Sequence, residues 1–381
     1  MADRLELLDH GVIFDATAAL PDARSCAFTS LLRLNDGALV VAFRNATGRD
    51  TPDGRLRIVR SGDDGRTWET LHAGMTATVA GVLGNLYSGY FTELAPGRLL
   101  GSFLWVDRSD PSRSFVHPET AGILPTRVLL AESADGGEQW GPFREVDLSP
   151  HVGCASTGPI RRLPSGALAL PYESWKAYDD RSPGRHAANL RLSFDGGQSW
   201  DQTATVAHDP TGRLLYWDQR FATHPETGEF VALFWTHDRV AGADLDNHIV
   251  WGSTNGTDWT PPIGTALPGQ HAQPIAVGGD RLVAVYVHRR DPPSLRAVLS
   301  DDFGRTWRRE TELSFYVSPA GSEPGTGGDR AFEDYWRDMM AWRFGHPRGV
   351  LLPDGDLIVA FYAGNETATS MHWARIGVGT R

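Results

Sequence analysis

Acidic side chains stand beside tryptophans at several points of this chain, and together they could act on a polar ring such as a sugar. Asp218 directly follows Trp217, and Glu173 precedes Trp175 by two residues. One carboxyl group can protonate a leaving oxygen while another group attacks or activates water. We predict a site in which Glu173, Asp218 and His346 are catalytic and the substrate contacts Arg44, Tyr87, Trp105, Trp217, His237, His271, Gln273, Arg289, Arg343 and Tyr362.

A repeated eight-residue pattern, Ser-x-Asp-x-Gly-x-x-Trp, indicates which elements position these residues. Asp and Ser side chains can bond to backbone N–H groups of a turn, Gly supplies a left-handed conformation, and Trp packs the turn against a sheet. The pattern therefore predicts a hairpin turn in each structural unit. Four full copies begin at Ser61, Ser133, Ser193 and Ser300, and a shortened copy at Ser253 has Asn255 in place of the aspartate.

Each copy follows the same local arrangement of a strand, a Gly turn, a second strand, a loop and a third strand. Residues Leu31–Phe43 show the first hairpin, and five similar hairpins follow it. The last unit, from about Trp342, has no such copy, so the N-terminal segment LELLDHGVIFD is expected to supply its missing strand. We predict an all-β fold, a six-bladed β-propeller with four-stranded antiparallel blades, in which the N-terminal strand closes the ring. One domain is expected to span residues 1–381.

Residues 318–341 interrupt this repeated arrangement of strands just before the last blade. The first half is rich in Gly, Pro and Ser, and the second half has helix-forming residues with Phe332, Trp336 and Met339 on roughly one face. Because the insertion leads directly to His346, we expect it to form a lid or a wall of the pocket. A surface insertion or an oligomer contact is the alternative.

The repeated boxes and the six-unit count resemble the sialidase (neuraminidase) superfamily, whose Asp-boxes are also known as BNR repeats. The resemblance covers nearly the whole chain. It implies a propeller with its site in the central cavity. Members of that superfamily bind a sugar carboxylate with three arginines and use a tyrosine nucleophile, an assisting glutamate and an acid/base aspartate.

Several of the catalytic positions differ from that superfamily. Alignment places Asp218 at the position of the assisting glutamate and His346 at that of the tyrosine. Asp50 and Asp53 both fall in the loop that carries the acid/base aspartate in the superfamily, and the resemblance implies that one of them keeps this role. Ala27 and Pro292 stand at two of the arginine positions. The resemblance thus implies a sialidase-like protein whose catalytic motifs have diverged and whose substrate is not ordinary sialic acid.

Three functions remain open at this point. The first is an exo-acting, sialidase-like glycoside hydrolase on a glycan that could be acidic, with Asp53 or Asp50 and Asp218 as the acid/base pair. A polysaccharide lyase would instead use His346 with Tyr87 or Tyr362 to remove a proton next to a uronate carboxylate. A non-catalytic carbohydrate-binding propeller would need only aromatic rings.

The net charge of the chain limits the classes of partner that it is expected to bind. The formal net charge of -11 disfavours nucleic acid and anionic membrane surfaces, because both repel an acidic protein. We expect a small-molecule or oligosaccharide substrate, no metal and no organic cofactor. The opening residues MADRLELLDHG do not resemble a secretory signal, which suggests a cytoplasmic protein or a secreted one whose signal has been removed.

Overall fold

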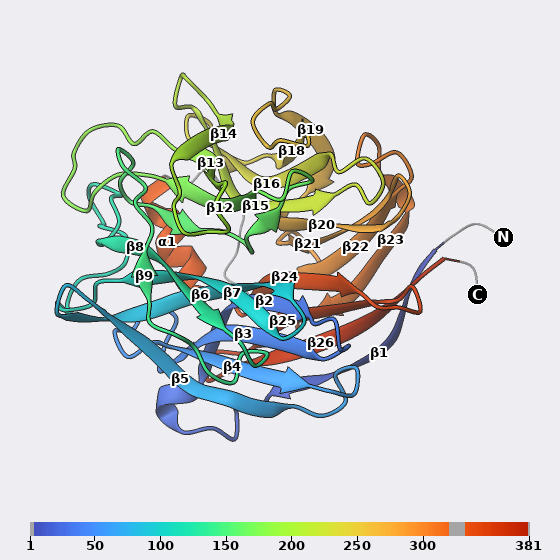
Figure 1. Cartoon of the computed structure of the whole chain (residues 1–381), viewed down its shortest axis with the longest axis horizontal. Coiled ribbons are helices and arrows are strands. Elements are labelled where there is room, and N and C mark those ends of the chain that lie inside the picture. Colours follow the sequence, from blue (N-terminus) through green and yellow to red (C-terminus); the bar gives the residue numbers. More distant parts are fainter. Residues whose placement is uncertain (1–3, 320–331, 380–381) are drawn as a thin grey trace.

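The computed structural model describes residues 4–319 and 332–379. In this part of the chain it contains 26 strands, the helix α1 (Phe332–Ala341) and the short 3-10 helix η1 (Pro21–Ala23). The predicted all-β class is therefore confirmed. The strands form consecutive antiparallel units, which are numbered here from the first to the sixth in chain order (Figure 1).

The first two units are joined by a hairpin between β5 and β6. The first unit contains β2 (Ser25–Arg33), β3 (Leu39–Ala46), β4 (Arg55–Ser61) and β5 (Glu69–Val79). The second contains β6 (Val82–Ala95), β7 (Arg98–Val106), β8 (Thr126–Ser133) and β9 (Arg144–Glu145).

The third and fourth units form separate sheets. The third contains the short strands β10 (Ala155–Ser156) and β11 (Arg161–Arg162), then β12 (Leu168–Ser174), β13 (Ala187–Ser193) and β14 (Gln202–His208). The fourth contains β15 (Leu214–Thr223), β16 (Phe230–Asp238), β17 (Ala243–Asp244), β18 (Asp246–Gly252) and β19 (Ile263–Pro268).

The sixth unit takes its fourth strand from the beginning of the chain. The fifth unit contains β20 (Gln270–Gly278), β21 (Arg281–His288), β22 (Ser294–Ser300) and β23 (Arg308–Val317). The sixth contains β24 (Phe344–Leu351), β25 (Leu357–Gly364), β26 (Thr369–Val378) and β1 (Leu5–Phe14). Strand β1 runs antiparallel to β26, with Leu5 opposite Val378, so the two ends of the described chain lie side by side as the sequence predicts (Figure 1).

Neighbouring units contact one another in a closed cyclic order. Strand β2 contacts β24 and β6, β20 contacts β15 and β24, and the third unit meets its neighbours through β10 with β7 and β12 with β15. Apolar side chains fill the space between units; Val283 and Val285 of β21, for example, pack with Val359 and Phe361 of β25. Second strands such as β3 and β16 are buried along their whole length, because a neighbouring unit covers each face.

The repeated pattern folds as the predicted turn between the third and fourth strands of a unit. In the first copy the Ser61 hydroxyl accepts a bond from Gly65 N at 2.9 Å, Asp63 accepts from Thr67 N at 2.8 Å, and the Trp68 indole donates to Gly65 O. Hydrogen bonds from the turn hold the pKa of Asp63 at about 2. These boxes are structural elements of the sheet edge.

This geometry predicts a stability effect for the serine of a full box. The Ser193 hydroxyl is buried and accepts a 2.8 Å bond from Gly197 N. Ser193→Ala leaves that buried N–H without its acceptor and is expected to lower the free energy of unfolding by about 1–3 kcal/mol. Denaturant unfolding followed by circular dichroism measures the change. In the shortened box Ser253 accepts only a 3.3 Å bond in exposed surroundings, so Ser253→Ala should cost less; equal losses would contradict the role of burial.

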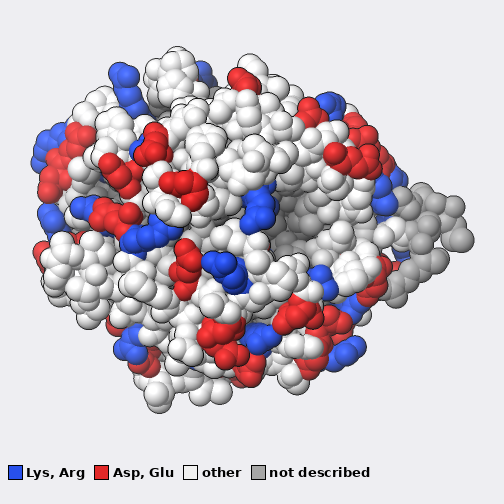
Figure 2. Space-filling view, viewed as in Figure 1, with Lys and Arg blue, Asp and Glu red and all other residues white. Residues whose placement is uncertain are grey.

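The outer surface carries charges of both signs. Figure 2 shows acidic and basic residues interspersed on the face drawn there, around a hollow with mostly uncharged walls. No helix in the described residues is long and apolar enough to cross a lipid bilayer.

Candidate active site

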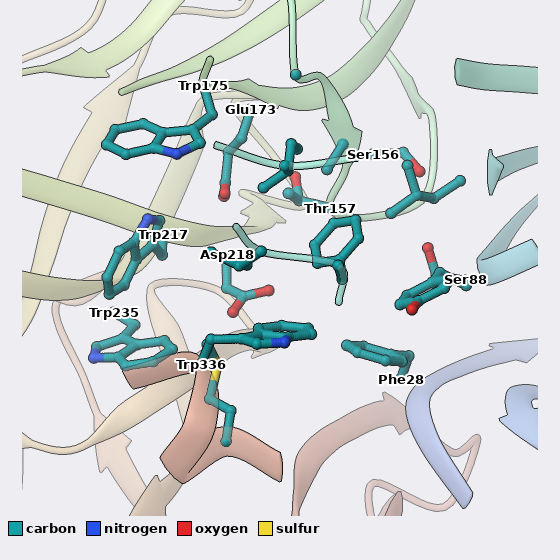
Figure 3. Close-up of a pocket in the computed structure, with 18 of the residues that line it drawn as sticks. Phe28, Ser88, Ser156, Thr157, Glu173, Trp175, Trp217, Asp218, Trp235 and Trp336 are labelled. Atoms are coloured by element: carbon teal, nitrogen blue, oxygen red, sulfur yellow. The ribbon is translucent and has the colours of Figure 1, made fainter. Parts of the chain in front are cut away.

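The first strands of all six units converge on one pocket. Each contributes at least one lining residue, and the pocket has a volume of about 210 Å³. One representative of each, in unit order, is Phe28, Tyr87, Ser156, Asp218, His271 and His346. Residues hundreds of positions apart in the sequence thus face a common space (Figure 3).

A β-bulge turns the lining residue of several first strands toward this space. Asp218, His271, His346 and Phe28 have φ values of 53°, 51°, 48° and 56°, and each lies inside a register shift of its strand. A left-handed conformation is costly for residues other than Gly, and such strain concentrates at functional sites. A left-handed residue inside a bulge recurs in the first strands of four units. This indicates that packing of the whole fold holds these residues in a backbone conformation that is unfavourable for each of them locally.

Two carboxyl groups, Glu173 and Asp218, face the pocket from neighbouring units (Figure 3). Glu173 is the second-to-last residue of β12; its Oε1 accepts a 3.1 Å bond from Gln219 N, and its Oε2 lies 3.3 Å from Nε2 of His186. Burial raises the pKa of Glu173, and the charge of Asp218 raises it further. We therefore expect Glu173 to hold a proton at higher pH than an ordinary glutamate.

The environment of Asp218 has the opposite effect. Its Oδ2 lies 2.8 Å from Nε2 of His271, and the guanidinium groups of Arg220 and Arg348 are close enough to act on its charge. Burial by itself raises the pKa of Asp218, but His271 and the two arginines outweigh it and lower the pKa below the ordinary value of 3.8. Asp218 is therefore ionised when Glu173 is still protonated.

The two histidines beside Asp218 are neutral in this environment. Burial lowers the pKa of His271 to about 4, which leaves its Nε2–H as a donor to Asp218. Burial also lowers the pKa of His346 well below its ordinary value, and the nearby charges of Arg220, Arg49 and Arg348 lower it further. The two imidazole rings lie 4.3 Å apart, and Nδ1 of each is buried without a hydrogen-bond partner in the described residues.

Aromatic side chains form much of the pocket wall (Figure 3). Trp217 lies 4.7 Å from Trp235 between ring centroids and stacks on His237 with an interplanar angle of 9°. Trp175 donates from its indole to Ala121 O at 2.6 Å, which holds the ring in place. Flat rings held in this way suit the apolar face of a sugar.

Helix α1 closes one side of the pocket with Trp336 and Met339. The Trp336 indole packs 5.1 Å from the Phe115 ring and donates to Asp50 Oδ2 at 3.3 Å. The predicted wall therefore includes these two residues. Residues 320–331 and the side chain of Phe332 lie outside the described residues.

Six of the residues proposed from the sequence line this pocket. They are Tyr87, Glu173, Trp217, Asp218, His271 and His346. The others lie behind the wall or away from it, and their contacts show what each does in the fold.

The Asp50 carboxylate is bound by residues that form the pocket wall. It accepts hydrogen bonds from the Tyr87 hydroxyl at 2.6 Å and from Phe115 N at 2.9 Å, and it lies 3.1 Å from Arg108. With Trp336 as a third hydrogen-bond donor, this carboxylate connects a first strand, a loop and helix α1. Asp50 is placed to organise the wall.

Arg44 and Asp53 hold the loop between β3 and β4. Buried Arg44 donates to the carbonyl oxygens of Gly48 and Thr51, and Asp53 accepts from both the backbone and the hydroxyl of Thr47. A Cβ on Gly54 would lie 2.3 Å from the Arg44 guanidinium, so only glycine leaves room for that side chain. Neither Arg44 nor Asp53 lines the pocket.

The remaining proposed residues connect or support units. Trp105 donates to Ala77 O in the core, Gln273 exchanges two bonds with the backbone of Gly349, and Arg289 lies 4.1 Å over the Trp342 ring. His237 supports Trp217 from behind and pairs with Asp244 at 3.2 Å. Tyr362 accepts a hydrogen bond from Arg49, and Arg343 precedes β24 without lining the pocket.

Sequence reasoning missed Phe28, Arg49, His186 and Trp235 among the lining residues. Phe28 could have been found by aligning the units, because it precedes the hairpin glycine Gly37 by nine residues, as His346 precedes Gly355. Arg49 lies in a loop with no repeat signal. Its guanidinium packs over the rings of Phe28 and Tyr362. In the described part of the chain, His, Cys, Asp and Glu side chains form no group of three that could hold a metal ion.

Solved structures, sialidases among them, have the same fold at low sequence identity. A protein of unknown function from Dyadobacter fermentans is 18% identical with a TM-score of 0.72, over 98% of this chain and 99% of that chain. The Hadza microbial sialidase Hz136 is 14% identical with a TM-score of 0.64, over 96% and 68%. The intramolecular trans-sialidase from Ruminococcus gnavus, in complex with oseltamivir carboxylate, is 10% identical with a TM-score of 0.61, over 97% of each chain.

The sequence pattern of the BNR repeat-like domain family matches residues 114–315, more than half of the chain. The chain therefore belongs to that family, within the sialidase superfamily that its repeats predict. A search of curated proteins finds no match.

Proposed function

We propose that this protein is a glycoside hydrolase whose six units are the blades of a β-propeller and whose active site is the central pocket. The cyclic contacts between units support the propeller arrangement. So does the convergence of six first strands on one space, since blades arranged radially bring those strands to a common axis.

The observation that carries the proposal is the pair Glu173 and Asp218. Both face the pocket, and their surroundings move their pKa values in opposite directions. A protonated and an ionised carboxyl group in one site are what glycoside hydrolysis needs. Glu173 would protonate the leaving oxygen, and Asp218 would attack the sugar or activate water.

The pocket favours the end of a sugar chain. Inner strands and helix α1 enclose it, and its walls are largely aromatic. Arg49 is the one arginine among its described lining residues. A single guanidinium group suits a neutral sugar, and it supports a substrate other than ordinary sialic acid, whose carboxylate the superfamily binds with three arginines.

A lyase mechanism has weaker support from the same geometry. The Tyr87 hydroxyl donates to Asp50, and burial raises its pKa, so it is a poor proton carrier at neutral pH. The Tyr362 hydroxyl accepts from Arg49. The ring of Tyr362 lies 6.0 Å from that of His346 between centroids, so a lyase would need this tyrosine as its acid although Arg49 already binds its hydroxyl.

The test is a substrate panel. Aryl glycosides of neutral sugars, uronic acids and sialic acids, together with uronate oligosaccharides, are incubated with the full chain. We expect released reducing ends or aryl alcohol from a terminal sugar. Unsaturated product detected by ultraviolet absorbance would instead establish the lyase, and binding of a glycan without turnover would establish a non-catalytic binding protein.

Trp336→Ala is expected to raise the KM for the best substrate about 10-fold, with a smaller effect on kcat. The substitution removes an aromatic wall and its contact with Asp50, and a 10-fold change corresponds to about 1.4 kcal/mol, the upper end for one such contact. Steady-state kinetics measures it. Phe194→Ala is the control, since Phe194 is 68% exposed on a box turn. An unchanged KM in Trp336→Ala would show that helix α1 does not contribute to substrate binding.

A further inference from the structure

A second, smaller cavity lies along the same first strands, beyond the pocket. The residues two positions after the left-handed residues line it: Ser30 after Phe28, Arg220 after Asp218, Gln273 after His271 and Arg348 after His346. Its volume is about 30 Å³. A cavity of that size holds about one or two particles the size of a water molecule.

Three guanidinium groups line this cavity: Arg161, Arg220 and Arg348. Arg220 is 1% exposed and Arg348 is 5% exposed. Burial and the repulsion from Arg348 lower the pKa of Arg220 to about 9 and that of Arg161 to about 10, so both remain charged at neutral pH. Three like charges therefore meet in the interior.

Carbonyl oxygens accept only some of the hydrogen bonds that these three guanidinium groups can donate. Arg220 donates from Nη1 to His271 O and Pro347 O, Arg348 donates to Thr157 O, and Arg161 donates to Phe221 O. Nε and Nη2 of Arg220, together with Nε of Arg161 and of Arg348, are buried without a hydrogen-bond acceptor in the described residues. Buried N–H groups of charged side chains that lack an acceptor are strongly destabilising.

No carboxylate compensates inside the cavity. None of its described lining residues is acidic, and no described Asp or Glu forms an ion pair with these three arginines. Asp218 acts on Arg220 and Arg348 from the pocket side but forms its close pair with His271. A buried positive cluster of this kind needs a counter-ion.

We propose that this inner cavity binds a monovalent, halide-sized inorganic anion, held by Arg161, Arg220 and Arg348. The free N–H groups of Arg220 are the central donors, and the volume excludes polyatomic organic acids. The site has its own lining: among the described residues Tyr90 is the one that lines both spaces, and none of the three arginines lines the pocket.

Two measurements on the full chain test this proposal without depending on activity. Crystals grown in bromide in place of chloride should show an anomalous scattering peak inside the cavity, beside Arg220. In solution, exchanging sodium gluconate for sodium chloride or bromide at constant ionic strength should raise Tm by at least about 2 °C, because an ion that binds only the folded state stabilises it.

Arg161→Gln removes one donor from the partly buried member of the cluster and should abolish most of the halide-dependent rise in Tm. Arg191→Gln is the control, because Arg191 is partly buried, bonds to Thr203 and lies outside the cavity. Absence of the anomalous peak, with equal Tm values in gluconate and halide, would show that the cavity contains water and overturn the proposal. A peak without any halide effect on Tm would indicate an adventitious ion only, which also overturns it.

Discussion

Asp218→Asn is expected to lower kcat/KM by at least roughly 100-fold on the best substrate of the panel. The substitution keeps the shape of the side chain but removes the negative charge that the pocket holds next to His271 and the inner arginines. An amide neither attacks the sugar nor takes a proton from water. Steady-state rates and a circular dichroism spectrum, recorded on the same preparation, separate chemistry from folding.

A matched control exists elsewhere in the chain. Asp280 also forms a carboxylate–imidazole pair, 2.9 Å from Nε2 of His224, but it is exposed and lies outside the pocket. Asp280→Asn should leave kcat/KM within about twofold of the original rate, since a surface pair contributes little. If Asp218→Asn keeps the original rate, or if both variants lose the same activity, Asp218 has no catalytic role.

Glu173→Gln should remove the basic limb of the pH–rate profile. In the original protein the reaction needs Glu173 protonated and Asp218 ionised. Because burial raises the pKa of Glu173, activity should extend above the ordinary glutamate range and fall as pH rises through that raised pKa. Because the pKa of Asp218 is lowered, the acid limb should lie below 3.8.

The glutamine cannot donate a proton, so the variant should lose roughly 100-fold or more in kcat/KM on a substrate with a poor leaving group. The loss should be smaller on an aryl glycoside whose leaving group needs no proton. The measurement is kcat/KM between about pH 3 and about pH 9 for both substrates. Equal losses on the two substrates, or an unchanged basic limb, would contradict an acid role for Glu173.

Glu312→Gln is the control for this variant. Glu312 is also a partly buried carboxylate, bonded to Tyr286 and 2.8 Å from Arg296, but it lies outside the pocket. We expect its pH–rate profile to match that of the original protein. A changed profile would mean that loss of a buried carboxylate disturbs the site through stability alone.

The box turns were predictable because their interactions are local. Ser61, Asp63, Gly65 and Trp68 contact one another within eight residues, so the pattern of side chains specifies the turn by itself. The hairpins and the missing strand of the last unit followed from counting such turns. The N-terminal strand that pairs with β26 was therefore predictable from the sequence.

The site was only partly predictable. Asp218 and Glu173 could be proposed from their positions near strand ends and beside tryptophans, but Asp50 and Asp53 looked equally suitable. The difference arises from contacts that span the chain, since Asp50 is bound by Tyr87 and Phe115 and Asp53 by the Thr47 loop. A carboxylate already surrounded by donors cannot be recognised from its neighbours in sequence.

By itself, the sequence determined the class of fold, the repeated turns and most of the residue types near the centre. Only the tertiary structure decided which of them share a space. Bulges turn Asp218, His271 and His346 into one pocket and place Arg220 and Arg348 in another. The physical reason is that protonation and binding depend on the charge and solvent around a group, and in this fold those surroundings come from other units.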